Sequence, residues 1–153
     1  MVSRPTPNSR AAYPHFEILA TRWADNDIYG HMNNAIHYQL FDTAVNGFLL
    51  REGILAGPGA AKCRGDATTI FLVVSSSCDY FAELAFPQTI AAGLRIAHLG
   101  KSSIRYDIAL FADDAETASA QGHFTHVNVH PQTRRPEPIN QTARTILNRL
   151  QPV

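Results

Sequence analysis

The sequence is poor in cysteine: only Cys63 and Cys78 occur among its 153 residues. Two cysteines are too few for a disulfide framework, and their separation is not typical of a metal site. We therefore expect both thiols to be reduced and the protein to be cytoplasmic. The formal net charge is zero, so no overall field attracts nucleic acid. No apolar run approaches the ~18–20 residues needed to span a bilayer, and we expect no membrane partner.

Several motifs of common enzymes are also missing. The sequence has no Gly-x-Ser-x-Gly, which argues against a serine hydrolase. Gly57-Pro58-Gly59 lacks the third glycine of a nucleotide-binding loop and contains a proline, so a surface turn is the better interpretation. On a strand, His123 and His126 point to opposite faces, and His126 and His130 lie ~13 Å apart. We therefore predict no metal site and no cofactor.

The first residues carry few structural signals. Residues 1–13 contain no apolar stretch of the kind that a signal peptide needs, and we predict that they form a disordered leader. No repeat or linker divides the remainder, and its length suits one domain. Residues 14–153 are therefore predicted to be a single domain.

Five runs have the composition of β-strands. They are rich in β-branched and aromatic residues or alternate apolar with polar positions, and turn residues such as Pro87 and Gly100 separate them. Their alternation indicates antiparallel pairing with one buried face. The runs are 15–23, 68–81, 88–99, 102–111 and 117–130.

Two segments have the apolar period of a helix. The longer one runs from about residue 34 to 50, with Asn33 or Asn34 as its N-cap and Gly53 as its stop. Gly47 within it hints at close packing against another backbone. A short helix follows Asn140 near the end of the chain.

This order of elements predicts an α+β fold. A five-stranded antiparallel sheet needs its apolar face covered, and the long helix is the obvious cover. We expect the sheet to wrap around that one central helix, with the short C-terminal helix added. Sheet edges left open favour edge pairing, so we also predict a homo-oligomer, either a homodimer or a homotetramer.

Polar residues gather where the first strand meets the long helix, in the segment 22–34 (RWADNDIYGHMNN). Unpaired N–H groups and the positive end of the helix dipole lie at such a junction, which suits the binding of a developing negative charge. Asp25 and Asp27 taken alone are more typical of turn and cap residues. Asp42, inside the helix, faces solvent or forms a second polar group of the site.

This segment, continued to Tyr38, resembles the motif Asp-x-Asp-x-x-Gly-His-x-Asn-Asn of hotdog-fold acyl-CoA thioesterases of the 4-hydroxybenzoyl-CoA thioesterase type. Residues 99–103 and 123–127 add weaker similarity. The resemblance implies a hotdog fold, dimers paired edge to edge, and active sites at the subunit interface. It implies Asp27 as the catalytic carboxylate and the backbone N–H of Asn34 as the oxyanion donor. It leaves Asp25 as a structural residue.

The resemblance also implies roles for residues outside these two. His31 lies in the site, but no proton-transfer step is assigned to it. Lys101, Ser102 and Ser103 fall where relatives contact the nucleotide part of coenzyme A, and Tyr38 is counted with these substrate-binding residues. The Ser75-Ser76-Ser77 run is interpreted as a polar patch near a ligand tunnel or an interface.

Elementary chemistry agrees with this assignment. The pKa of a free thiol is near 8.5, so the leaving thiolate needs little help from a general acid. Asp27 can act as general base on water or as nucleophile through a mixed anhydride, and the sequence does not choose. The expected activity is hydrolysis of an acyl-CoA to a carboxylic acid and CoA. A non-catalytic acyl-CoA-binding module of the same fold is the alternative, and a hotdog dehydratase is less favoured because no His/Asp or His/Glu dyad is evident.

Overall fold

The computed structural model describes residues 2–55 and 70–152. These residues form five strands, two α-helices and three short 3₁₀ turns. The elements are η1 (Arg10–Ala12), β1 (His15–Ala20), η2 (Trp23–Asp25), α1 (Asn34–Arg51), β2 (Ile70–Tyr80), β3 (Thr89–Leu99), β4 (Ser103–Ala112), β5 (Ala120–Val129), α2 (Gln141–Leu147) and η3 (Asn148–Leu150).

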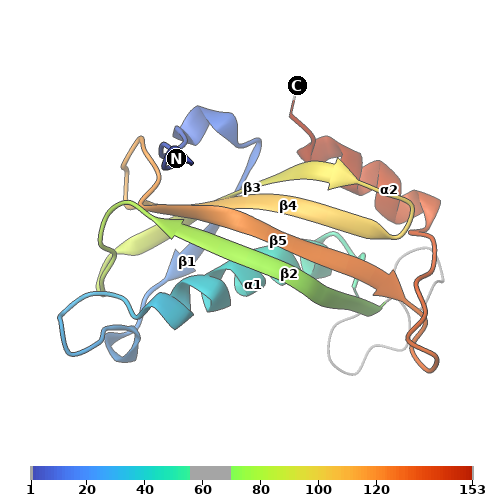
Figure 1. Cartoon of the computed structure of the whole chain (residues 1–153), viewed down its shortest axis with the longest axis horizontal. Coiled ribbons are helices and arrows are strands. Elements are labelled where there is room, and N and C mark those ends of the chain that lie inside the picture. Colours follow the sequence, from blue (N-terminus) through green and yellow to red (C-terminus); the bar gives the residue numbers. More distant parts are fainter. Residues whose placement is uncertain (1, 56–69, 153) are drawn as a thin grey trace.

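The five strands form one antiparallel sheet in the order β1-β3-β4-β5-β2 (Figure 1). The edge strands are therefore β1 and β2, the strands that flank α1 in the sequence. The predicted α+β fold, with a five-stranded antiparallel sheet, one long helix and a short C-terminal helix, is confirmed. The first strand ends at Ala20, earlier than expected, because Trp23–Asp25 form a 3₁₀ turn.

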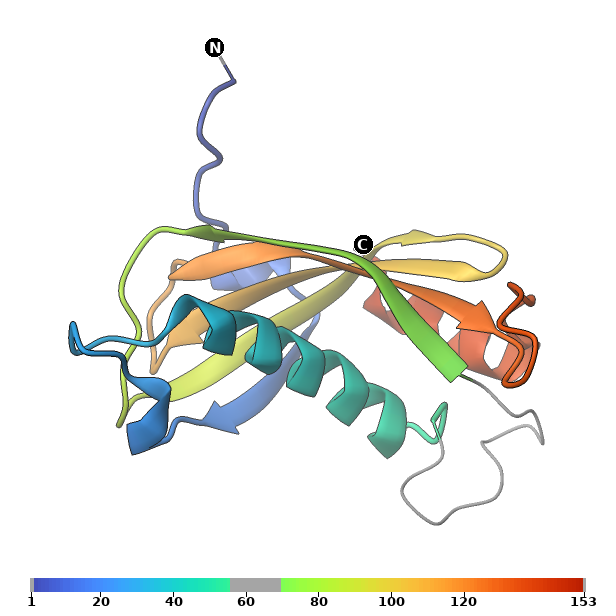
Figure 2. The ribbon, with the colours of Figure 1, turned by 60° about the horizontal axis from the view of Figure 1, so that its bottom comes forward.

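Helix α1 lies across the concave face of the sheet (Figure 2). Its predicted cap is Asn33, whose Oδ1 accepts a hydrogen bond from the Ala35 N–H at 3.0 Å. At the other end Gly53 has a φ of +71°, a conformation that glycine adopts without strain. The expectation for Gly47 was wrong: a Cβ added there meets no atom within 4 Å, so no backbone packs against it.

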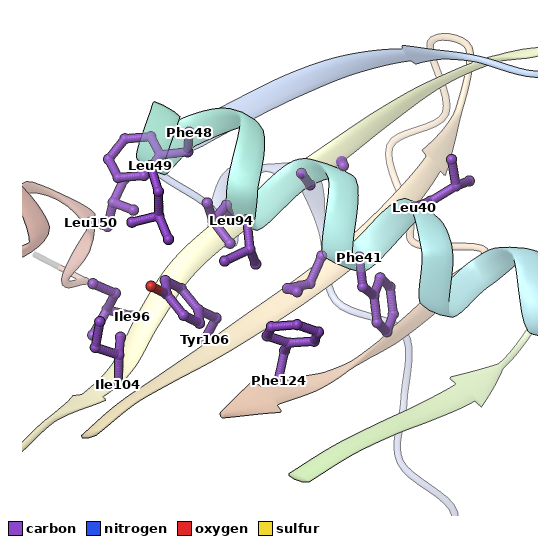
Figure 3. Packing of buried hydrophobic residues seen from close by; sticks show 14 of the residues in the cluster. Leu40, Phe41, Phe48, Leu49, Leu94, Ile96, Ile104, Tyr106, Phe124 and Leu150 are labelled. Carbon is purple, nitrogen blue, oxygen red and sulfur yellow. The ribbon is translucent and has the colours of Figure 1, made fainter. Parts of the chain in front are cut away.

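The core lies between α1 and the sheet. Seven helix residues are buried because they recur every three to four positions and so share one face. The facing residues of β3 and β4 alternate along each strand, as in Leu94 and Ile96 or Ile104 and Tyr106. Figure 3 shows Phe41 close to Phe124, and Leu150 of η3 close to Leu49. The C-terminal elements thus extend the same core beyond the end of α1.

Residues 8–13, which the sequence interpretation assigned to a disordered leader, contact the sheet. Tyr13 is 5% exposed, and its ring covers Gly93, where an added Cβ would lie 2.7 Å from the Tyr13 ring. The Tyr13 ring also meets Phe111 edge-to-face. Arg10 donates a backbone hydrogen bond to Glu116 O at 2.8 Å. Residues 8–13 therefore pack on the outer face of the sheet, because the missing side chain of Gly93 leaves room for an aromatic ring.

The histidines of β5 lie as the strand pattern predicts. His123 is on the outer face, with Nδ1 2.7 Å from Ser77 Oγ, whereas His126 is buried against Phe71 and Tyr106. Burial lowers the pKa of His126 to about 4, so its ring is neutral. Within residues 2–55 and 70–152, no cluster of three metal-ligating side chains occurs. No helix among them is long and apolar enough to cross a membrane.

Two expectations fall on residues that the structure does not describe. Cys63 and the turn Gly57-Pro58-Gly59 lie within 56–69, outside the described residues. Cys78 lies on β2, is half-buried, and has its pKa raised to about 11 by burial. That thiol is therefore protonated and a poor nucleophile at neutral pH.

Candidate active site

The connection from β1 to α1 is a tight loop held by its own backbone. Asp27 N–H donates to His31 O at 2.9 Å, and Gly30 N–H donates to Asp27 O at 3.1 Å. Gly30 has a φ of +87°, which side chains with a Cβ rarely adopt, so glycine is needed for this turn. The turn brings the side chains of Asp27 and His31 to one side of the loop.

Asp25 stabilises the loop and faces away from the solvent. It is 2% exposed, and its carboxylate accepts hydrogen bonds from the Arg22 backbone N–H and from Arg22 Nε and Nη2 at 2.7–3.0 Å. A buried carboxylate of this kind needs its hydrogen-bonding partners, because leaving it unpaired is costly. Its contacts are those of the structural residue that the sequence interpretation expected.

Asp27 is more open. Its Oδ1 accepts a hydrogen bond from the Tyr29 N–H at 2.8 Å, and about a quarter of its side chain is exposed. Its Oδ2 lies 3.9 Å from His31 Nδ1, and His31 Nε2 lies 3.9 Å from Glu83 Oε1. These distances are too long for hydrogen bonds. One oxygen of Asp27 is thus fixed by the loop, while the other is available to a ligand.

The first turn of α1 offers an unpaired N–H group. The Asn33 cap satisfies the N–H of Ala35 through its side chain and that of Ile36 through its backbone oxygen at 2.9 Å. Among the described residues, none accepts a hydrogen bond from the Asn34 N–H. This donor is at the positive end of the helix dipole, so it can bind an oxyanion.

A cavity of about 480 Å³ joins these groups. The loop before α1 forms one wall, the first turn of α1 another, and the end of β2 with the residues after it the third. Met32 and Leu84 are buried and belong to the apolar part of its lining. The lining residues are Asp27, Tyr29, His31, Met32, Asn34, His37, Tyr80, Phe81, Ala82, Glu83 and Leu84.

The structure therefore brings together three of the predicted site residues: Asp27, His31 and Asn34. Tyr38 is not among the lining residues; the residue is 37% exposed, and its ring meets Phe41 edge-to-face. Asp42 is exposed and accepts a hydrogen bond from Asn46 on the helix surface, so it faces solvent.

The predicted coenzyme A residues Lys101, Ser102 and Ser103 lie away from this cavity. Ala20 pairs with Thr89, so β3 begins beside the loop that carries Asp27 and runs away from it. At ~3.3 Å per residue, the end of β3 at Leu99 is roughly 33 Å from its start. The turn 100–102 therefore lies at the opposite end of the sheet, beside α2 (Figure 1). Within one chain these three residues do not contribute to the cavity.

His37 and Tyr80 are among the lining residues that the sequence interpretation missed. His37 is 4% exposed, its Nδ1 lies 3.3 Å from Asn33 O, and burial lowers its pKa. Its position one turn after Asn33 and Asn34 could have placed it beside the helix N-terminus. Tyr80 meets the His37 ring edge-to-face, and its hydroxyl donates to Asn34 O at 3.4 Å. No local signal predicts that contact, because Tyr80 is 46 residues away in sequence.

Known proteins match both the sequence and the fold. The sequence profile of the thioesterase-like superfamily matches residues 21–147. The PA5185 protein from Pseudomonas aeruginosa strain PAO1 is 49% identical, with 95% of this chain and 97% of that chain covered and a TM-score of 0.87. A comparison with curated proteins gave no match.

Two solved thioesterases share the fold. The thioesterase from Thermus thermophilus, complexed with coenzyme A and Zn, is 25% identical, with 92% of this chain and 96% of that chain covered and a TM-score of 0.70. The 1,4-dihydroxy-2-naphthoyl-CoA thioesterase from Synechocystis is 18% identical, with 87% of this chain and 94% of that chain covered and a TM-score of 0.74.

The profile match spans most of the chain and includes both the Asp27 loop and α1. It confirms the resemblance drawn from the segment 22–34. This chain belongs to the thioesterase-like superfamily, and it is a thioester hydrolase with the hotdog fold.

Proposed function

We propose that the substrate is an acyl-CoA and that the cavity beside the N-terminus of α1 is where its thioester is hydrolysed. The observation that carries this proposal is the placement of Asp27 and the unpaired Asn34 N–H in one cavity. A carboxylate and an oxyanion donor are the two groups that this reaction most needs, because the thiolate leaves readily. The coenzyme A complex of the Thermus thermophilus thioesterase supports the choice of substrate class.

The proposed reaction starts with the thioester carbonyl oxygen at the Asn34 N–H. As base, Asp27 takes a proton from water, and the resulting hydroxide adds to the carbonyl carbon. The Asn34 N–H and the helix dipole stabilise the negative charge that develops on the oxygen. The tetrahedral intermediate then breaks its C–S bond and expels the CoA thiolate, leaving the carboxylic acid. His31, 3.9 Å from Asp27, is placed to orient groups in the cavity.

As nucleophile, Asp27 would instead attack the carbonyl carbon and form a mixed anhydride, which water then hydrolyses. A single turnover in H₂¹⁸O distinguishes the base route from a nucleophile route in which water attacks the Asp27 carbonyl of the anhydride. The base route puts ¹⁸O into the acid product. The nucleophile route, with water attacking the Asp27 carbonyl, leaves ¹⁸O in Asp27 after the first turnover.

Release of free thiol from acyl-CoAs tests the proposed function. We expect turnover with at least one member of a panel of aryl and aliphatic acyl-CoAs, detected with a thiol-trapping dye. Saturable binding of an acyl-CoA with no thiol released over hours would contradict hydrolysis and favour a non-catalytic binding module. The panel also identifies the acyl group, which the lining residues leave open.

We further propose that a second copy of this chain pairs with β2. This edge strand exposes three successive apolar residues, Leu72, Val73 and Val74, at 39–60% of their surface. An apolar open edge favours strand pairing, and β2 ends at the cavity residue Tyr80. Light scattering after size-exclusion chromatography should give at least twice the 16.8 kDa chain mass; the monomer mass at micromolar concentration would contradict this.

A further inference from the structure

The cavity is lined by two carboxylates and by no side chain that carries a permanent positive charge. Asp27 and Glu83 line it, and none of its lining residues is a lysine or an arginine. An acyl-CoA carries several negative phosphate charges, which two carboxylates near the entrance repel. The pantetheine chain separates those phosphates from the thioester, so a cation that binds them belongs outside the cavity, at its rim.

Arg4 supplies a cation at this rim. Its Nη2 donates a hydrogen bond to the backbone oxygen of Tyr80 at 2.6 Å, and its guanidinium carbon lies 5.8 Å from the centre of the Phe81 ring. Tyr80 and Phe81 both line the cavity. Arg4 is exposed and takes part in none of the ion pairs among the described residues, so its positive charge is not neutralised by a carboxylate there.

The chain that carries Arg4 is fixed close by. The side chain of Gln121 accepts a hydrogen bond from Asn8 N–H at 2.7 Å and donates one to Thr6 O at 3.1 Å. The N–H of Ala118 donates to Asn8 O at 2.9 Å. Pro5 follows Arg4 directly, which restricts the backbone of both residues. The backbone that carries Arg4 is therefore ordered before the Arg4 side chain binds a ligand.

We propose that Arg4 binds the phosphate groups of the acyl-CoA substrate at the rim of the cavity. This inference rests on the proposed function and adds a binding residue to it. A guanidinium has five N–H donors, and the bond to Tyr80 occupies one of them. The remaining donors can form charge-assisted, bidentate hydrogen bonds to a phosphate, which a lysine ammonium cannot match in geometry.

Two substrates with the same acyl group test this assignment: the acyl-CoA and the acyl thioester of N-acetylcysteamine, which lacks phosphates. Arg4→Gln should raise KM for the acyl-CoA roughly tenfold, the value of one charge-assisted contact, with kcat unchanged. The same variant should have the wild-type KM and kcat for the N-acetylcysteamine thioester. Arg4→Lys should give an intermediate KM, and added salt should reduce the difference between wild type and Arg4→Gln.

Arg135→Gln is the matched control. Arg135 is exposed and follows the end of β5 at Val129, whereas the cavity lies at the other end, where Ala120 pairs with Tyr80. The Arg135→Gln substitution removes the same charge from the chain as Arg4→Gln and should leave the KM values for both substrates unchanged.

Three results would overturn the proposal. An equal loss of kcat/KM for both substrates in Arg4→Gln would mean that Arg4 only holds the Tyr80–Phe81 wall in place. An unchanged KM for both substrates in Arg4→Gln would mean that Arg4 binds no phosphate. An equal rise in KM for the acyl-CoA in Arg135→Gln would mean that the effect comes from the total charge of the chain. If the wild type hydrolyses neither thioester, the proposed function fails by itself. The dissociation constant of CoA then tests Arg4, with roughly tenfold weaker binding expected for Arg4→Gln.

Discussion

Replacing Asp27 by Asn should reduce acyl-CoA hydrolysis by roughly 10²–10⁴-fold, the usual contribution of a general base. The amide has the shape of the carboxylate but can neither accept a proton from water nor attack the thioester. Its oxygen can still accept the hydrogen bond from the Tyr29 N–H, so the loop should keep its conformation. Thiol release under steady-state conditions measures the effect, with KM expected to change little.

Asp42→Asn is the matched control for this variant. Asp42 is also a carboxylate of the segment around α1, but it is exposed and bonded to Asn46 on the helix surface. The control should retain wild-type activity, and both variants should melt at the wild-type temperature. Undiminished hydrolysis by the Asp27→Asn variant would show that another group performs the chemistry.

The second large effect is expected for Asn34→Pro. Proline lacks the backbone N–H, so the variant removes the proposed oxyanion donor while leaving the other side chains of the cavity in place. Loss of one such donor typically lowers kcat by roughly 10²–10³-fold. Asn34 is the first residue of α1, where proline is well tolerated, and Asn33 has an extended conformation (φ −58°, ψ 136°) that suits the residue before a proline.

Asn34→Ala provides the comparison, since it deletes the same side chain but keeps the N–H. We expect nearly normal kcat for Asn34→Ala and a large loss for Asn34→Pro, with similar circular dichroism and thermal stability for both. If both variants kept wild-type activity, the backbone N–H of Asn34 would have no role in the reaction. Equal losses would instead assign the effect to its side chain.

The fold could be predicted from the sequence because its signals are local. The alternation in 88–99 and 102–111 and the helical period after Asn34 depend on residues a few positions apart. The cap at Asn33 follows from its own side chain. Asp27 and Asn34 are only seven residues apart, so one turn and one helix end suffice to bring them to the same cavity.

Features that depend on distant contacts could not be predicted. The N-terminal segment reads as a disordered leader because it is polar and rich in proline, yet Tyr13 finds a site over Gly93. Tyr80 reaches the cavity because β2 is the edge strand beside the start of α1, and its sequence position does not show this. Lys101 was expected near the substrate, but the register of β1 with β3 places its turn at the far end of the sheet.

The most direct test of the account is a crystal structure of the Asp27→Asn variant with an acyl-CoA that the variant cannot turn over. We expect the thioester carbonyl oxygen within hydrogen-bond distance of the Asn34 N–H and the residue 27 side chain beside the carbonyl carbon or a water next to it. A thioester bound elsewhere, with the cavity between the Asp27 loop and Tyr80 left unoccupied by it, would contradict the account.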